Sequence, residues 1–146
     1  MKRQYEIHAT LSALPVFKNC NRRQIEQIAS IVDQVDVPAG HVLCREGGVA
    51  RECFVIVSGQ VEVTLDGVHV ATVGAGETVG EMALLDGGRR SATVTTTTAT
   101  VALVIEGRRF EALVHSMPAV SEAVVRELSA RLREQDDATV GHRPAS

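Results

Sequence analysis

The most informative stretch of the sequence runs from Gly76 to Val94 and reads GETVGEMALLDGGRRSATV. Within it, Gly80–Leu84 is predicted to form a turn of helix, and free backbone N–H groups at the positive end of a helix dipole favour an anion. Arg90 follows after a loop that contains Gly87-Gly88. Its guanidinium fork can hold two oxygens of one phosphate. These features together predict a phosphate site.

Glu81 lies inside the same segment, although a carboxylate repels a phosphate. Its presence fits a ligand that also carries a hydroxyl donor close to the phosphate, as a ribose does. Alternatively, Glu81 and Arg90 form a salt bridge that closes the loop without any ligand. The residue types and their spacing leave both interpretations open.

The segment lies within a region where the sequence favours strands. Apolar residues alternate with polar ones from Val35 onward, whereas the continuous apolar run Cys53–Val57 is typical of a strand buried on both faces. Asp66-Gly67 stands between two alternating segments and predicts a two-residue hairpin. Ser91–Ile105 is rich in β-branched residues and predicts two more strands, with Thr95–Thr98 interpreted as a half-exposed strand rather than a phosphorylation site.

Helical periodicity precedes this region. A short amphipathic helix is predicted to end before Pro15, and Asn21 is predicted to cap a second helix, with Gln24 completing a capping box. The apolar face of the first helix consists of Ile7, Leu11 and Leu14.

Helical periodicity also returns after the strands. A short helix follows Arg108, and a longer amphipathic helix runs from Pro118 to about Gln135. The apolar stripe of this longer helix can pack on the core, dimerise, or close over a ligand, and packing on the core is the default interpretation. The stripe consists of Val120, Val124, Val125, Leu128 and Leu132.

These elements predict a mainly β fold with flanking helices (α+β), an eight-stranded β-roll or jelly roll with N-terminal and C-terminal helices. The chain has 146 residues, of which 45% are hydrophobic and 23% are charged. This composition is that of a globular domain rather than a disordered chain. We predict a single domain over residues 1–135 and a flexible C-terminal tail over residues 136–146.

Charge and cysteine content narrow the functional classes. The formal net charge is −3, so no basic field is available to bind a nucleic acid backbone. The three cysteines form no CxxC pair, which favours buried thiols in a reducing compartment over a disulfide framework. The longest apolar run, Val101–Ile105, is far too short to span a membrane. A cytoplasmic protein without membrane insertion is predicted.

The sequence offers no candidate for catalysis or metal binding. The five histidines are scattered without metal-ligand spacing. No general acid and base pair lies near Gly76–Val94, and Ser58-Gly59 lacks the preceding glycine of a nucleophile elbow. We therefore predict no catalytic residues, no metal site and no enzymatic activity.

The segment around Gly80 resembles the phosphate-binding cassette of cyclic nucleotide-binding domains, the family of catabolite activator protein and the protein kinase A regulatory subunits. That cassette reads roughly aromatic-Gly-Glu-apolar-Ala-Leu and then Pro-Arg-small-Ala. The matching positions here are Val79, Gly80, Glu81, Met82, Ala83, Leu84, Arg89, Arg90, Ser91 and Ala92. The resemblance extends over Leu11–Arg133 and includes Leu14–Phe17, Pro38–Gly40, Arg45–Gly47 and Phe54–Val61.

The resemblance implies a role for each matched position. Gly80 lets the backbone approach the sugar, and Glu81 accepts the ribose 2′-OH. The backbone N–H groups of Met82, Ala83 and Leu84 meet the cyclic phosphate, and Arg90 pairs with its exocyclic oxygens. Ser91 donates to the phosphate and to the base, and Ala92 packs beneath the ligand. Val79 completes the predicted ligand-binding set.

Two positions depart from the family pattern. Val79 replaces the usual phenylalanine, and Arg89 replaces the usual proline, which predicts a less rigid loop before Arg90. A loop that must be ordered on binding lowers affinity. Ser91 favours cAMP over cGMP, since threonine at this position is the residue that often favours guanine in the family.

The resemblance implies a regulatory module that binds cAMP or, as the alternative ligand, cGMP, needs no other cofactor, and signals to an effector protein by moving its C-terminal helix. The residues after Gln135 are too few for a helix-turn-helix, so we expect no direct DNA binding. The alternative is a scaffold or interaction domain of the same fold with a weak or empty pocket, and retention of Glu81 and Arg90 favours the sensor. Whether the sensor stands alone or is part of a longer chain, and whether it is a monomer or a dimer, stays open.

Overall fold

The computed structural model describes residues 2–80, 83–84, 88–126, 129–130 and 133. It contains helices at both ends of a β-rich centre, and residues 118–126 form a further helical segment, here called the 118–126 helix. The labelled elements are α1 (Lys2–Ala13), α2 (Arg22–Ala29), β1 (Val32–Val37), β2 (Val42–Cys44), β3 (Glu52–Ser58), β4 (Val61–Leu65), β5 (Val68–Val73), β6 (Thr78–Val79), β7 (Thr93–Thr96), β8 (Thr100–Glu106) and α4 (Gly107–Ser116).

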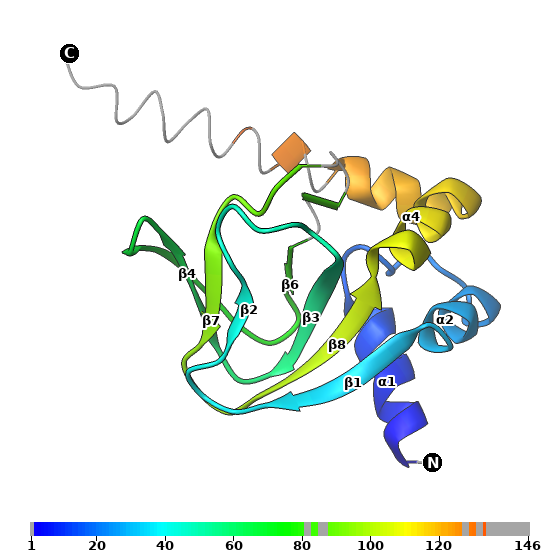
Figure 1. Cartoon of the computed structure of the whole chain (residues 1–146). Coiled ribbons are helices and arrows are strands. Elements are labelled where there is room, and N and C mark those ends of the chain that lie inside the picture. The colour runs from blue at the N-terminus through cyan, green and yellow to red at the C-terminus, as the bar shows by residue number, and fades with distance from the viewer. Residues whose placement is uncertain (1, 81–82, 85–87, 127–128, 131–132, 134–146) are drawn as a thin grey trace.

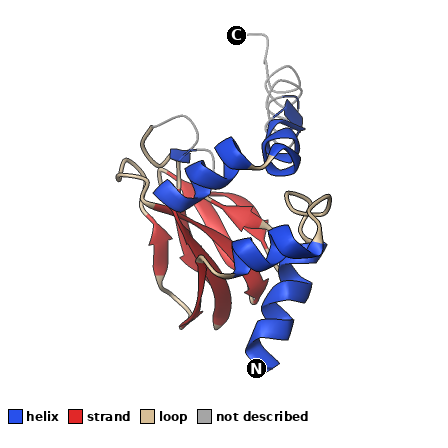
Figure 2. Ribbon diagram, turned by 90° about the vertical axis from the view of Figure 1, so that its right-hand side faces the viewer, coloured by secondary structure: helices blue, strands red, loops and turns tan. Residues whose placement is uncertain are grey.

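The eight strands form two four-stranded antiparallel sheets, with strand orders β1-β8-β3-β6 and β2-β7-β4-β5 (Figure 1). Figures 1 and 2 place α1, α2 and α4 on the same side of this roll, next to the first sheet. This arrangement confirms the predicted eight-stranded roll with flanking helices.

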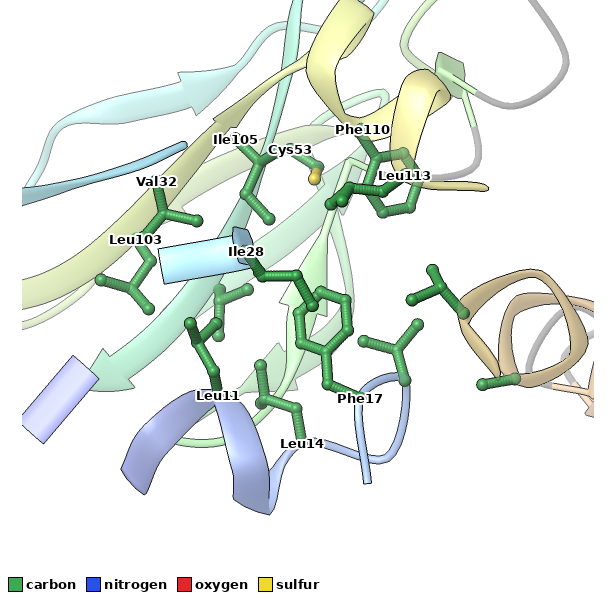
Figure 3. Close-up of a cluster of buried hydrophobic side chains, with 14 of the residues drawn as sticks. Leu11, Leu14, Phe17, Ile28, Val32, Cys53, Leu103, Ile105, Phe110 and Leu113 are labelled. Atoms are coloured by element: carbon green, nitrogen blue, oxygen red, sulfur yellow. The ribbon is translucent and has the colours of Figure 1, made fainter. Parts of the chain in front are cut away.

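Two hydrophobic cores hold the layers together. The helix-side core lies between the helices and the first sheet (Figure 3), and the roll core lies between the two sheets. Strand β3 contributes Cys53 and Val55 to the helix-side core and Phe54 and Ile56 to the roll core, and all four are buried. The continuous apolar run is therefore a strand buried on both faces, as predicted.

The second helix begins as its sequence predicts. The Asn21 side chain accepts a hydrogen bond from the Gln24 N–H at 2.9 Å, and the Gln24 side chain accepts one from the Asn21 N–H at 2.8 Å. This capping box satisfies two donors that have no partner within the helix. It fixes the start of α2 so that Ile25 and Ile28 face the helix-side core, where they are buried.

The hairpin between β4 and β5 also follows its sequence. Asp66 and Gly67 have φ values of +51° and +80°, and a two-residue hairpin with positive φ at both central positions is a type I′ turn. The register pairs Leu65 with Val68 directly across the turn. The prediction of a hairpin at Asp66-Gly67 is confirmed.

The four consecutive threonines do not form one half-exposed strand, so this prediction is wrong. Strand β7 ends at Thr96, which is 1% exposed, and the chain then turns before β8. The Thr96 hydroxyl donates to the Pro38 carbonyl at 2.6 Å and accepts from the His41 N–H at 2.9 Å. Burial of a hydroxyl requires such partners, and here they come from the turn before β2.

The apolar stripe of the 118–126 helix is narrower than predicted. Val120 and Val124 are buried in the helix-side core, whereas Val125 is 61% exposed. Successive residues of an α-helix point about 100° apart, so a helix that buries Val124 turns Val125 toward solvent. The remainder of the predicted stripe and the predicted helix end lie outside the described residues: Leu128, Leu132 and Gln135.

The thiols lie in or beside these cores. Cys44 and Cys53 are buried, as predicted, and Cys20 is half-buried, where burial raises the pKa of its thiol. Within the described part of the chain, no helix has both the length and the apolar character needed to cross a bilayer.

Candidate functional site

Strand β6 leads directly into the predicted phosphate-binding segment. Val79 pairs with Phe54 of β3 and is buried in the roll core. Gly80 follows with a φ of +86°, and residues 83–84 form a short helical turn whose side chains are partly exposed. Glu81 and Met82, two of the predicted ligand-binding residues, lie outside the described residues.

Arg90 is the most deeply placed charged group of the site, with 6% of its surface exposed. Its Nη1 donates to the Gly80 carbonyl at 2.8 Å, and its Nη2 donates to the Glu52 carbonyl at 2.5 Å. The same Nη2 lies 3.8 Å from the Glu52 carboxylate. A guanidinium has five N–H donors, so these contacts orient the group while leaving donors for a further acceptor.

Gly80 is required by the position of Arg90. A Cβ atom at residue 80 would collide with the Arg90 Nη1, and its positive φ is a conformation that other residues rarely adopt. The structure thus brings Gly80 and Arg90 into direct contact. The resemblance assigned Gly80 to a close approach of the sugar, and the contact with Arg90 is an additional reason for a glycine there.

Glu52 is the residue that the sequence interpretation missed. It begins β3, and its side chain is 35% exposed. The interpretation without a ligand paired Arg90 with Glu81, but the acidic partner found among the described residues is Glu52. No local pattern links positions 38 apart in the sequence. They meet because β3 pairs with β6, and because Arg90 is itself hydrogen-bonded to the loop that leads into β3.

The backbone of residues 89 and 90 pairs with the loop between β2 and β3. The Arg90 N–H donates to the Gly48 carbonyl, and the Gly47 N–H donates to the Arg90 carbonyl, each at 2.9 Å. Arg89 forms an antiparallel bridge with Val49. Residues 89 and 90 are therefore paired with this loop, whereas residues 85–87 lie outside the described residues, and the lower rigidity expected from Arg89 stays a prediction. Of the two positions that follow, Ser91 is exposed and Ala92 is half-buried.

A cavity of about 670 Å³ is lined both by residues 83–84 and by the start of α4. Its lining includes Arg51, Glu52, Leu84, Gly107 and Arg108. Leu84 packs against the helix-side core, and a Cβ added at Gly107 would lie 2.9 Å from its Cδ2 atom. Leu84 thereby connects the predicted binding segment to α4.

The described residues include no group of three or more His, Cys, Asp or Glu side chains placed to hold a metal ion. Among the described residues, the polar groups at the site include the buried Arg90 guanidinium, the Glu52 carboxylate and backbone amides. Such a set can bind and orient an anion.

The fold is a two-sheet antiparallel β-roll in which a buried arginine contacts the glycine that follows β6. The sequence model of the cyclic nucleotide-binding domain matches residues 34–117, and the chain belongs to this family. The match covers the roll and α4.

Relatives and solved structures agree with this assignment. A cyclic nucleotide-gated potassium channel of Rhizobium etli is 36% identical over 114 residues, which are 78% of this chain and 32% of the channel. A cyclic nucleotide-binding domain from Methylobacillus flagellatus superposes with a TM-score of 0.78 at 25% identity and covers 98% of this chain and 85% of its own. The catabolite activator protein of Thermus thermophilus has a TM-score of 0.76 at 29% identity, with coverages of 84% and 60%. The chain thus spans about a third of the channel.

Proposed function

We propose that this chain binds a cyclic nucleotide, cAMP in preference to cGMP, through Val79–Leu84 and Arg90–Ala92. The observation that carries the proposal is the buried Arg90 guanidinium, which donates to the carbonyl of Gly80, three residues before the helical residues 83–84. A guanidinium and helix N–H groups that converge on one point form a strong site for a phosphate. The names of the R. etli and M. flagellatus relatives support a cyclic nucleotide as the ligand.

In this proposal the cyclic phosphate takes donors of Arg90 and the backbone N–H groups of residues 82–84. Arg90 keeps or exchanges its bonds to the Gly80 and Glu52 carbonyls as the phosphate arrives. Glu81 accepts the ribose 2′-OH, which explains a carboxylate beside a phosphate. Val79 and Ala92 pack near the ligand, and both are at least half-buried.

Base preference is assigned to Ser91. Its side chain is exposed, so its hydroxyl is accessible to a ligand held by Arg90. A serine donates one hydrogen bond and accepts two, and the resemblance associates serine here with adenine.

A thermal-shift panel with cAMP, cGMP and 2′-deoxy-cAMP tests the function. A ligand at a hundred times its dissociation constant stabilises the folded state by about 2.7 kcal/mol. We expect the largest rise in melting temperature with cAMP, a smaller rise with cGMP, and the smallest with the 2′-deoxy analogue, which cannot donate to Glu81. AMP serves as the control for a non-cyclic phosphate.

The outcomes of the panel separate the alternatives. No shift with any cyclic nucleotide at millimolar concentration would favour the scaffold domain with a weak or empty pocket. Equal shifts with cAMP and 2′-deoxy-cAMP would show that Glu81 does not accept a hydrogen bond from the ribose 2′-OH. A larger shift with cGMP would reverse the base preference.

We further propose that binding becomes output through the C-terminal helices. Leu84 of the binding segment contacts Gly107 at the start of α4, and Val120 and Val124 of the 118–126 helix share the helix-side core with Leu84. A shift of Leu84 on ligand binding therefore changes the packing of both helices. A ligand shifts a two-state element only by its differential affinity for the two states.

Hydrogen exchange with and without cAMP checks this coupling. We expect altered protection in α4 and the 118–126 helix as well as in residues 76–92. Changes confined to residues 76–92, with both helices unaffected, would contradict the switch. Leu84→Ala is the informative variant, because it keeps the backbone N–H assigned to the phosphate and removes the side chain that contacts α4; the response of α4 to cAMP should be lost.

The proposed output is contact with an effector protein, without catalysis by this chain and without direct DNA binding. A domain over residues 1–135, with residues 136–146 as a flexible tail, and a cytoplasmic location also stay predictions of the sequence.

A further inference from the structure

The β4–β5 ladder alone does not set the direction of the hairpin end. Val63 pairs with Ala71, and the next residue, Thr64, pairs with His69. Val70 is therefore an extra residue in β5, a β-bulge. A bulge bends the strand that contains it and increases its local twist. The position of the turn beyond the bulge thus depends on contacts from outside the hairpin.

Glu46, in the loop between β2 and β3, provides such a contact. Its Oε1 accepts a hydrogen bond from the Asp66 N–H at 3.0 Å. Asp66 lies between the paired residues Leu65 and Val68, so its N–H is not part of the ladder. The Glu46 N–H donates to the Thr93 hydroxyl, also at 3.0 Å. Glu46 therefore connects the hairpin turn with the start of β7.

The same loop holds the backbone of Arg90. The Gly47 N–H donates to the Arg90 carbonyl, and the Gly48 carbonyl accepts from the Arg90 N–H, each at 2.9 Å. One short segment, residues 46–48, thus contacts both the hairpin turn and the arginine assigned to the phosphate. A shift of the turn relative to Arg90 strains or breaks these hydrogen bonds.

The hairpin end presents apolar side chains on the inner face of the second sheet. Along β4, Val61 and Val63 pack in the roll core, and Leu65 lies on the same face because side chains alternate along a strand. Val68 pairs with Leu65 across the turn. Leu65 and Val68 are 45% and 64% exposed. The inner face of the hairpin therefore continues the roll core outward as an exposed apolar surface.

This apolar surface lies beside two of the positions assigned to the ligand. Thr64, next to Leu65, pairs with Thr93, and Thr93 directly follows Ser91-Ala92. Sites for small molecules bury most of the ligand against apolar side chains. The base is the part of a cyclic nucleotide that can use this surface, because the phosphate and the ribose are assigned to other groups.

Building on the proposed function, we propose that Glu46 is a positioning residue for the base of the bound nucleotide, because it sets the hairpin end against the segment that carries Arg90. Without the Glu46 carboxylate, the hairpin end has to be ordered when the base binds, and the cost of this ordering lowers affinity. The contribution of one net hydrogen bond limits the effect to a factor of about 2 to about 13.

Calorimetry on Glu46→Ala and Glu46→Gln tests the role in base binding. The glutamine oxygen can still accept from the Asp66 N–H, whereas alanine cannot. We expect Glu46→Ala to weaken cAMP binding about fivefold and Glu46→Gln to weaken it less than about twofold. Ribose 3′,5′-cyclic phosphate carries no base, and its affinity should change less than about twofold in either variant.

Glu62→Ala is the matched control. It removes a carboxylate from the hairpin, but the partner of that carboxylate is His69 of the same hairpin, with an Nδ1–Oε1 distance of 3.0 Å. This variant should bind both ligands like the wild type. A loss for Glu62→Ala as large as that for Glu46→Ala would point to the charge of the hairpin and would refute the positioning role.

A double-mutant cycle checks that Glu46 acts through the apolar surface. In a chain that carries Leu65→Ala and Val68→Ala, adding Glu46→Ala should weaken cAMP binding less than about twofold. An undiminished loss in this background, or equal losses for cAMP and the ligand without a base, would overturn the inference.

Hydrogen exchange tests the contact itself without any nucleotide. The Asp66 amide should be protected in the wild type and in Glu46→Gln, and it should exchange faster in Glu46→Ala. Equal exchange rates in all three proteins would contradict the inference and leave the proposed function intact. A wild type that binds no cyclic nucleotide would overturn both.

Discussion

Replacing Arg90 with alanine is expected to weaken cAMP binding by a factor of about 30 to about 4,000. The truncation of one partner of a buried, hydrogen-bonded charge pair costs about 2–5 kcal/mol, and each 1.4 kcal/mol is a factor of ten. In the proposed complex the phosphate would lose its bidentate cation while remaining desolvated. Isothermal titration calorimetry with cAMP measures the change directly.

The fold of the Arg90→Ala variant should survive. The substitution leaves the Gly80 and Glu52 carbonyls without their present donors, and a net hydrogen bond contributes about 0.5–1.5 kcal/mol. We therefore expect a loss in unfolding free energy of about 1–3 kcal/mol, measured by urea denaturation. Arg90→Lys should restore binding only in part, because an ammonium cannot form a fork.

Arg89→Ala is the matched control for Arg90→Ala. Arg89 is the adjacent arginine, but it is exposed, and its Nη1 only reaches the Gly47 carbonyl at 3.5 Å. Its loss should change cAMP affinity by no more than a few-fold. Equal losses for the two variants would indicate a diffuse electrostatic effect, and an Arg90→Ala protein that binds cAMP within a few-fold of the wild type would refute the assignment of Arg90.

The second large effect is expected for Gly80→Ala. A side chain at a φ of +86° is strained, and its Cβ would collide with the Arg90 Nη1. Strain of this kind costs about 1–3 kcal/mol, and displacement of Arg90 from its two carbonyl acceptors adds about 1–3 kcal/mol more. We expect a lower unfolding free energy together with weaker cAMP binding. The displaced guanidinium would lose the orientation that its hydrogen bond to the Gly80 carbonyl now gives it.

Gly76→Ala separates strain from collision. Gly76 has nearly the same φ, +85°, but a Cβ there has no neighbour within 4 Å. It should lose stability through strain alone and retain cAMP binding. A double-mutant cycle is decisive: in an Arg90→Ala background, Gly80→Ala should cost about as much as Gly76→Ala. If Gly80→Ala costs the same with and without Arg90, the contact between Gly80 and Arg90 is not responsible.

Features that depend on neighbouring residues in the sequence were predicted correctly from the sequence. The capping box of Asn21 and Gln24 joins residues three apart, and the Asp66-Gly67 turn requires positive φ only at its own two positions. The buried strand Cys53–Val57 followed from an apolar run. Local hydrogen bonds and backbone sterics decide such elements before any tertiary contact forms. The strands that they delimit were enough to predict the roll.

The contact between Gly80 and Arg90 agrees with the segment that the sequence singled out, a glycine followed by a returning arginine, and ligand binding there stays a prediction. The sequence did not indicate which acceptors hold Arg90. Glu52 lies 38 residues before it, and the two residues meet because β3 pairs with β6 and because Arg90 is hydrogen-bonded to the loop that leads into β3. The backbone partners of residues 89 and 90 likewise come from a distant segment, the loop between β2 and β3.

Sequence alone therefore determined the class of fold and the local turns and caps, since these depend on residues a few positions apart. Tertiary structure decided which of several similar residues are buried and which partners they contact, because the local patterns do not distinguish them. In the folded chain Thr96 is buried and Val125 is exposed, although each belongs to a run of similar residues. Strand β5 lies at the end of the second sheet. The physical reason is that burial and partner choice depend on register and packing between distant elements, which no local pattern specifies.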